Sequence, residues 1–226
     1  MLAVWWNEVR ELNESNSKGV TMVNIIHDVQ ASLHCGHPRV WLFLLRALAK
    51  GRPVSRTTIA NALNTSLSDV DTALASFADT VYDDIGDIVA CGLSLMPTPH
   101  SFRVCGIGLY TWCALDALMY PVALAQVAQV ESRCPATGTP VRMTVTPTGV
   151  IGPSPAGVTI SMVAPPMQAG CCNVRNSFCS WVHFISSAEA AASWSARHPG
   201  TAILSLEEAW QLGYEVMQLR LLHEAE

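Results

Sequence analysis

Hydrophobic positions recur at helical spacing in three short stretches of the N-terminal part of the chain. These stretches cover residues 38–49, 57–63 and 68–77. The first stretch starts at Pro38, a residue suited to the first turn of a helix, and a serine cap signal precedes the third. The next segment, 81–95, is typical of two short strands around a turn. Three helices followed by a hairpin predict a winged helix-turn-helix, and an amphipathic stretch within residues 1–37 precedes it.

After residue 99 the pattern changes to short strand-like segments and then to helices. Strands are predicted at 102–104, 107–110, 141–145, 158–163 and 178–185, and helices at 112–119, 188–197 and 206–222. Thr111 is the expected N-cap of the first of these helices, and Pro121 its end or kink. The segment 178–185 is apolar on both faces, which predicts a central strand.

Together these patterns predict an α+β protein of two parts. Residues 1–91 form an N-terminal, winged-helix-like helical domain. Residues 92–226 form a mixed, mainly antiparallel β-sheet domain with flanking helices.

Composition and charge exclude several classes of protein. Of the 226 residues, 50% are hydrophobic and 14% are charged, which excludes a disordered chain or a charged coiled coil. The net charge is -5, and Lys and Arg are absent between Arg56 and Arg103. A recognition helix and wing without cations cannot neutralise phosphates, so we expect a structural domain and no nucleic-acid partner. A winged-helix transcription factor is the alternative that a gel-shift assay would test.

The same apolar character raises the question of a membrane partner. The longest nearly uncharged run, 110–130, contains Asp116 and Pro121, which argue against a membrane span. Because Met1 is followed by neither a basic region nor a long apolar one, we expect no signal peptide, no membrane partner and a cytoplasmic protein. The eight cysteines should then be thiols, and without a C-x-x-C pair structural zinc is not expected.

Cys113 and Asp116 stand three residues apart in a predicted helix, so their side chains share a face. A position in the first helical turn would favour the Cys113 thiolate. Burial in an apolar run should raise the pKa of Asp116 and keep a proton available near neutral pH. Cys179 lies in the apolar segment near the C-terminus. From the residues alone two interpretations stay open: a catalytic group, or cysteines packed as small hydrophobes beside a capping aspartate.

Three separated motifs in this chain resemble the alkylmercury lyase family of bacterial mercury resistance. They are residues 92–100 (GLSLMPTPH), 109–119 (LYTWCALDALM), and 176–179 (NSFC) followed by 182–184 (VHF). The resemblance covers residue 92 to the C-terminus and, more loosely, the winged-helix region. It implies that the family's two essential cysteines and its aspartate are Cys113, Cys179 and Asp116. It further implies protonolysis of a carbon–mercury bond without an organic cofactor, giving a hydrocarbon and Hg(II).

That reaction fits the chemistry of these residue types. Mercury is soft and prefers thiolate ligands, and a second thiolate weakens the carbon–mercury bond. Because the leaving carbon is a poor carbanion, an acid such as Asp116 must protonate it. Tyr110, Trp112 and Phe178 are candidate walls of an apolar substrate pocket. A heavy-metal buffer or sensor using the same thiols is the alternative, although a binding site alone has no need of a buried acid.

The remaining thiols have lesser expected roles. Cys134 matches a cysteine that is structural in the family. The neighbours Cys171 and Cys172 are either an accessory pair that captures or passes on Hg(II), or two exposed thiols without a role. Ser180 stands where many relatives have a further cysteine. Hg(II) held by two thiolates should leave only to external partners: small cellular thiols or the dithiol of a mercuric reductase. Residues 34–37 (HCGH) are a possible metal cluster or a polar loop.

Overall fold

The N-terminal part of the structure consists of three helices whose starts are set by local capping. The computed structural model describes residues 37–77, 79–163 and 174–224, so the amphipathic stretch before His37 lies outside the described residues. The helices are α3 (Pro38–Leu48), α4 (Arg56–Leu63) and α5 (Leu67–Ser76). The Ser66 hydroxyl accepts the Asp69 N–H at 3.1 Å, and the Asp69 carboxylate accepts the Ser66 N–H, which forms a capping box. The predicted helices are confirmed to within one or two residues.

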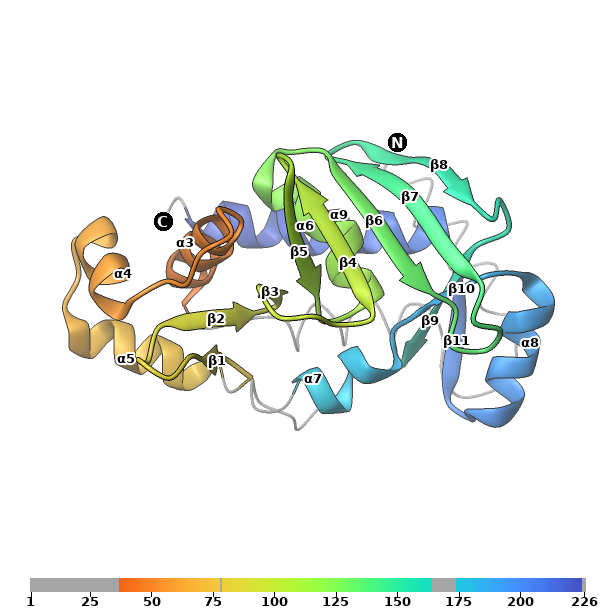
Figure 1. Ribbon diagram of the computed structural model, residues 1–226, viewed down its shortest axis with the longest axis horizontal. Helices are drawn as coiled ribbons and strands as arrows, with labels where there is room; N and C mark the ends of the chain where they lie inside the picture. The colour runs from red at the N-terminus through yellow and green to blue at the C-terminus, as the bar shows by residue number, and fades with distance from the viewer. Residues whose placement is uncertain (1–36, 78, 164–173, 225–226) are drawn as a thin grey trace.

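An eight-stranded antiparallel sheet forms the centre of the molecule (Figure 1), with strand order β1-β2-β3-β5-β4-β6-β7-β8. Its strands are β1 (Val81–Tyr82), β2 (Ile88–Cys91), β3 (Leu93–Ser94), β4 (His100–Val104), β5 (Ile107–Thr111), β6 (Ala128–Arg133), β7 (Pro140–Thr146) and β8 (Gly149–Ser154). Burial alternates along β6, so one face of the sheet packs on the core. Helices α6 and α9 cover that face (Figure 1).

The C-terminal part adds a small three-stranded antiparallel sheet, in the order β10-β9-β11. Its elements are β9 (Thr159–Val163), α7 (Val174–Ser177), a 3-10 helix (Cys179–Trp181), β10 (Phe184–Ile185), α8 (Ala188–Arg197), β11 (Thr201–Ser205) and α9 (Leu206–Glu224). The prediction of a central strand over 178–185 is wrong. The Trp181 N–H donates to the Phe178 carbonyl at 2.9 Å and closes a 3-10 turn, and only an edge strand follows.

Helix α6 (Ala114–Leu124) also differs from its prediction at both ends. Its N-cap is Cys113, because Thr111 still belongs to β5 and its hydroxyl donates to the Cys113 carbonyl at 2.9 Å. The helix continues through Pro121 to Leu124. A proline inside a helix removes a backbone hydrogen bond, but every residue of α6 before Leu124 is buried, and this packing holds the helix together.

One hydrophobic core connects the N-terminal helices to the sheet and to α9. It includes Leu42 and Leu45 of α3, Leu115 of α6 and Met217 of α9. The large sheet runs on past the predicted boundary between residues 91 and 92, since β2 pairs with β3 and β3 with β5. The division into domains 1–91 and 92–226 stays a prediction. None of the helices in the described part of the chain is long and apolar enough to cross a membrane.

Candidate active site

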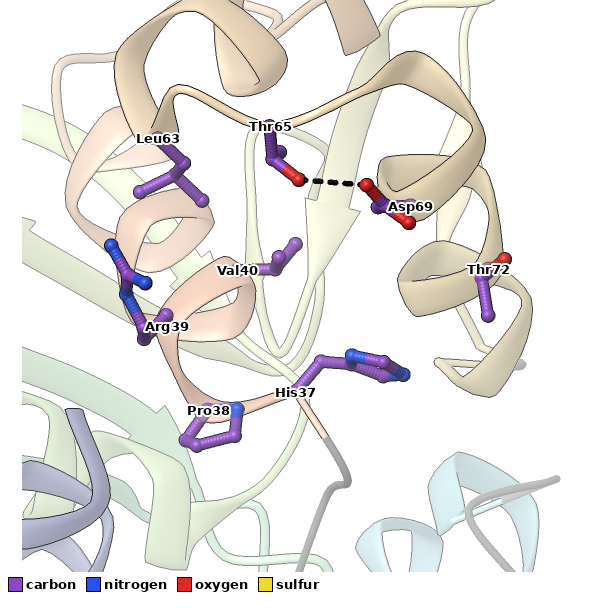
Figure 2. Close-up of a pocket in the computed structure, with 8 residues that line it drawn as sticks. All are labelled: His37, Pro38, Arg39, Val40, Leu63, Thr65, Asp69 and Thr72. Atoms are coloured by element: carbon purple, nitrogen blue, oxygen red, sulfur yellow. Dashed lines mark hydrogen bonds between the residues drawn. The ribbon is translucent and has the colours of Figure 1, made fainter. Parts of the chain in front are cut away.

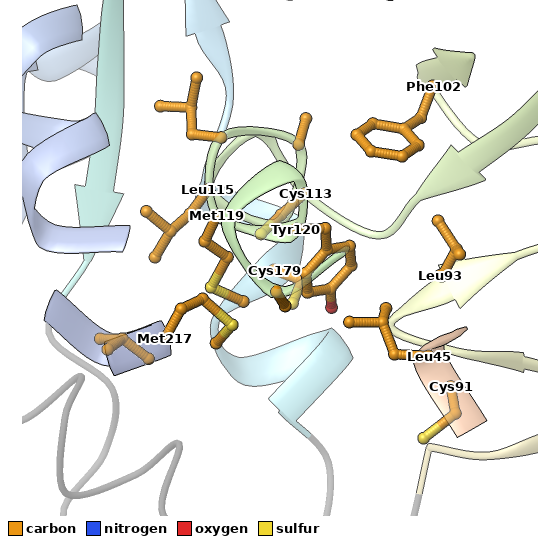
Figure 3. Close-up of a cluster of buried hydrophobic side chains, with 14 of the residues drawn as sticks. Leu45, Cys91, Leu93, Phe102, Cys113, Leu115, Met119, Tyr120, Cys179 and Met217 are labelled. Carbon is orange, nitrogen blue, oxygen red and sulfur yellow. The ribbon is translucent and has the colours of Figure 1, made fainter. Parts of the chain in front are cut away.

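Two cysteines and one aspartate from separate segments meet in the core. The Cys113 and Cys179 sulfurs and a carboxylate oxygen of Asp116 all lie within 4.8 Å of one another. Cys113 caps α6, Asp116 lies in the first turn of that helix, and Cys179 begins the 3-10 helix. The Ala114 N–H donates to the Val182 carbonyl at 3.1 Å, which ties the start of α6 to the end of the 3-10 turn. Figure 3 shows Cys113 at α6 with Cys179 next to it.

The pair of thiols is buried and protonated at rest. Cys113 is 0% exposed, and burial raises the pKa of its thiol well above the usual value, helped by the hydrogen bond with Cys179 and the Asp116 charge. The hydrogen bond from Cys113 lowers the pKa of Cys179, but burial and the Asp116 charge leave that pKa raised overall. The expectation that Cys113 is favoured as a thiolate is therefore wrong, because burial is the larger effect on its pKa.

Asp116 is a buried acid whose pKa lies close to neutral. Burial raises its pKa from 3.8 to about 6. Hydrogen bonds from the Tyr120 hydroxyl and the Cys113 thiol and backbone N–H oppose this shift, as does the Arg220 charge. The Cys113 N–H lies 3.1 Å from the Asp116 Oδ2 atom. An acid in this pKa range can both take up and give back a proton in neutral solution.

Sequence reasoning did not single out Tyr120 or Arg220, both of which influence Asp116. Tyr120 lies one helical turn beyond Asp116, so helical spacing could have revealed it. Arg220 reaches the site from α9, with its guanidinium 4.1 Å from the centre of the Trp41 ring. Only the packing of α9 on α6 and α3 brings that charge near Asp116, and local sequence patterns do not encode this packing.

The predicted pocket walls lie around the same start of α6. Phe178 is buried directly before Cys179, whereas Tyr110 and Trp112 are half-buried. The Arg175 guanidinium lies 5.7 Å from the centre of the Trp112 ring. Cys171 and Cys172 lie outside the described residues. The roles of Tyr110, Trp112 and Phe178 as pocket walls, and of the two cysteines as accessory thiols, stay predictions.

Three other cysteines in the described part of the chain are outside any disulfide bond, as expected, and are separate from this cluster: Cys91, Cys105 and Cys134. Cys134 packs in a second, smaller cluster with Ile185 and Trp194. Burial raises its pKa, but hydrogen bonds from Ser186 and Thr137 lower it more, so the net pKa is lowered. Cys134 thus lies apart from the paired sulfurs, and its packing agrees with a structural role.

A cavity of about 410 Å³ lies elsewhere, between the start of α3 and helices α4 and α5 (Figure 2). Its wall includes His37, Arg39 and Asp69, and none of the three buried groups above. The Asp69 carboxylate already accepts the Thr65 hydroxyl at 3.1 Å (Figure 2) and caps α5. This cavity is therefore separate from the cluster of Cys113, Asp116 and Cys179.

Comparisons of the sequence and of the structure with known proteins agree with each other. The family model of alkylmercury lyase matches residues 93–218, and that of the helix-turn-helix domain of alkylmercury lyase matches residues 28–92.

An alkylmercury lyase of Streptomyces lividans is 45% identical over 176 residues, which is 78% of this chain and 80% of that protein. One of Pseudomonas putida is 41% identical over 203 residues, covering 88% and 94%. A crystal structure of the mercury-bound form of MerB2 superimposes with a TM-score of 0.72 at 25% identity, covering 88% of this chain and 98% of that one.

Proposed function

The chain belongs to the alkylmercury lyase family and cleaves carbon–mercury bonds, and we propose that Cys113, Asp116 and Cys179 carry out this cleavage. The observation that supports the proposal is the approach of two sulfurs and a carboxylate oxygen to within 4.8 Å in a buried site. The family needs no organic cofactor. The substrate class is an organomercurial, which arrives as an adduct with a small thiol.

The first step is a thiol exchange at mercury. One cysteine thiol takes the organomercury group from its carrier, and the carrier leaves as a free thiol with the cysteine proton. The second cysteine then gives its proton to the Asp116 carboxylate and binds mercury as a thiolate. A second soft ligand donates electron density to the metal and weakens the carbon–mercury bond.

The second step is protonolysis. Protonated Asp116 delivers its proton to the carbon as the carbon–mercury bond breaks. The bond electrons form the new carbon–hydrogen bond, the hydrocarbon leaves, and Hg(II) remains on two cysteine sulfurs. Asp116 returns to its carboxylate form, so the atoms and charges balance. The resting thiols carry the proton because their pKa values are raised, and binding to mercury lowers the pKa of the second thiol so that the proton passes to Asp116. The pKa of Asp116 near 6 suits both transfers.

The surroundings of the cluster have supporting roles in this proposal. Tyr110, Trp112 and Phe178 bound the space that the organic group occupies, and Cys171 and Cys172 are accessory thiols at most. Small thiols or a mercuric reductase remove Hg(II). Nucleic acid is not a partner, because α5 presents Asp71, which pairs with Arg56 at 3.2 Å, where a DNA reader needs cations.

Benzene release from phenylmercury tests the proposal. The reduced protein is incubated with phenylmercury and excess thiol, and benzene is measured by gas chromatography. Cys113→Ser and Cys179→Ser should each abolish release, since a hydroxyl is too hard a ligand to activate mercury. The double variant Cys171→Ser/Cys172→Ser is the control and should keep most of the activity. A metal buffer would bind phenylmercury stoichiometrically and release no benzene.

A further inference from the structure

Tyr120 is buried beside the two sulfurs, although the reaction described above assigns it no task. It lies on the same face of α6 as Asp116, one turn later, and is 2% exposed. Its hydroxyl donates a hydrogen bond to the Asp116 carboxylate. Figure 3 shows its ring next to Cys113 and Cys179.

The hydroxyl of Tyr120 fits only because residue 92 is a glycine. A Cβ atom on Gly92 would overlap the hydroxyl oxygen and lie 3.1 Å from the ring carbon that bears it. Gly92 also has a φ of 78°, a conformation that favours glycine. This glycine begins the first of the three family-like motifs, and its contact with Tyr120 gives that position a physical reason in this chain.

A neighbouring ring packs against Tyr120. The Trp41 ring of α3 lies 5.9 Å from the Tyr120 ring, centre to centre, and the Arg220 guanidinium of α9 lies 4.1 Å from the centre of the Trp41 ring. Helices α3, α6 and α9 therefore meet around this side chain. With Trp41 against its ring and Gly92 against its hydroxyl, Tyr120 presents that hydroxyl at a fixed point.

We propose that Tyr120 is a positioning residue for carbon–mercury cleavage: its hydroxyl, seated against Gly92, holds the Asp116 carboxylate toward Cys113 and Cys179. The proposal rests on the proposed function of Asp116. The Cys113 N–H fixes one carboxylate oxygen at 3.1 Å, and the Tyr120 hydroxyl adds a second point of attachment. Two attachments prevent rotation of the carboxyl group, and proton transfer to carbon requires a well-defined donor geometry.

Single-turnover cleavage of phenylmercury by Tyr120→Phe tests the proposal. Binding of phenylmercury and the melting temperature should stay close to wild type, while the rate of benzene release falls about 10-fold to 100-fold, as for one lost hydrogen bond to a charged group. In an Asp116→Asn background the same substitution should cause no further loss, because its effect passes through Asp116. A wild-type rate in Tyr120→Phe, or an equal loss in both backgrounds, overturns the proposal.

Gly92→Ala tests the same contact by changing the residue against which the Tyr120 hydroxyl packs. Its matched control is Gly86→Ala, which has a similar φ of 85° but open space at its Cβ. Gly92→Ala should slow cleavage, Gly86→Ala should not, and Gly92→Ala should have little effect on the rate when Tyr120 is already Phe. Equal slowing by both alanine variants would contradict the proposal that contact with Gly92 positions the Tyr120 hydroxyl. A wild-type rate in Asp116→Asn would instead remove the proposed function on which the inference rests.

Discussion

Asp116 differs from the two thiols in that a substitution can remove its proton while keeping its shape. Asp116→Asn should still bind phenylmercury on Cys113 and Cys179, but cleavage should fall by about 10²–10⁴-fold, as for other general acids. The measurement is the single-turnover rate together with the binding stoichiometry. With wild-type protein in D₂O the benzene should carry one deuterium, and a variant that loses binding and folding together would indicate a structural brace instead.

Burial of Asp116 also predicts how stability depends on pH. Its pKa rises from 3.8 to about 6 on folding, so the folded state holds a proton that the unfolded state releases between these values. The cost of the buried carboxylate is absent below pH 3.8 and fully present above about pH 6. Relative to Asp116→Asn, wild type should therefore lose about 2 kcal/mol of unfolding free energy from pH 4 to pH 7. Urea unfolding of both proteins along this range measures the difference, and a constant difference would contradict the raised pKa.

How much of the site the sequence predicts depends on how local each feature is. The burial of Asp116 follows from the apolar run around it. The approach of Cys179 to Cys113 came from the family resemblance, since their distance along the chain says nothing of it. The raised pKa of Cys113 was missed because a cap position favours the thiolate, and only the packed structure shows that burial is the larger effect.

At the scale of elements, the helices with a serine cap were predicted well and the apolar segment near Cys179 was not. The Ser187 hydroxyl accepts the Ala190 N–H at 3.2 Å, and α8 occupies the predicted residues 188–197. Capping chemistry is local and can therefore be read from a few residues. An apolar run such as 178–185 indicates burial only, and a 3-10 turn that buries Phe178 and Cys179 satisfies it as well as a strand does.

The crossing of α6 and α9 gives a prediction at this scale. A Cβ on Gly213 would lie 2.9 Å from the Met119 Cβ, so the two helices approach each other closely at this glycine. Alanine is the better helix former by about 1 kcal/mol, yet Gly213→Ala should destabilise the protein because the contact must open. Thermal unfolding measures the change. Leu219→Ala, on the same helix and 45% exposed, is the control and should have a smaller effect.

The whole molecule encloses the reacting groups between the N-terminal helices, the sheet and α9, and this has a consequence for product release. Cys113 is 0% exposed and Cys179 3% exposed, so Hg(II) held by both sulfurs has little access to water. Without added thiol we expect a burst of one benzene per protein and then no turnover. Small thiols should restore steady turnover by ligand exchange. The burst amplitude measures this directly, and continuous turnover in thiol-free buffer would contradict it.

The protonated state of the paired thiols also affects how readily they are oxidised while no substrate is bound. Peroxide oxidises the thiolate rather than the thiol, and sulfinic and sulfonic acids formed at a cysteine are lasting damage. Cys113 and Cys179 have raised pKa values, so we expect the two sulfurs proposed to bind mercury to be poor targets for peroxide. We therefore expect the burial of Cys113 and Cys179 to slow their oxidation by peroxide.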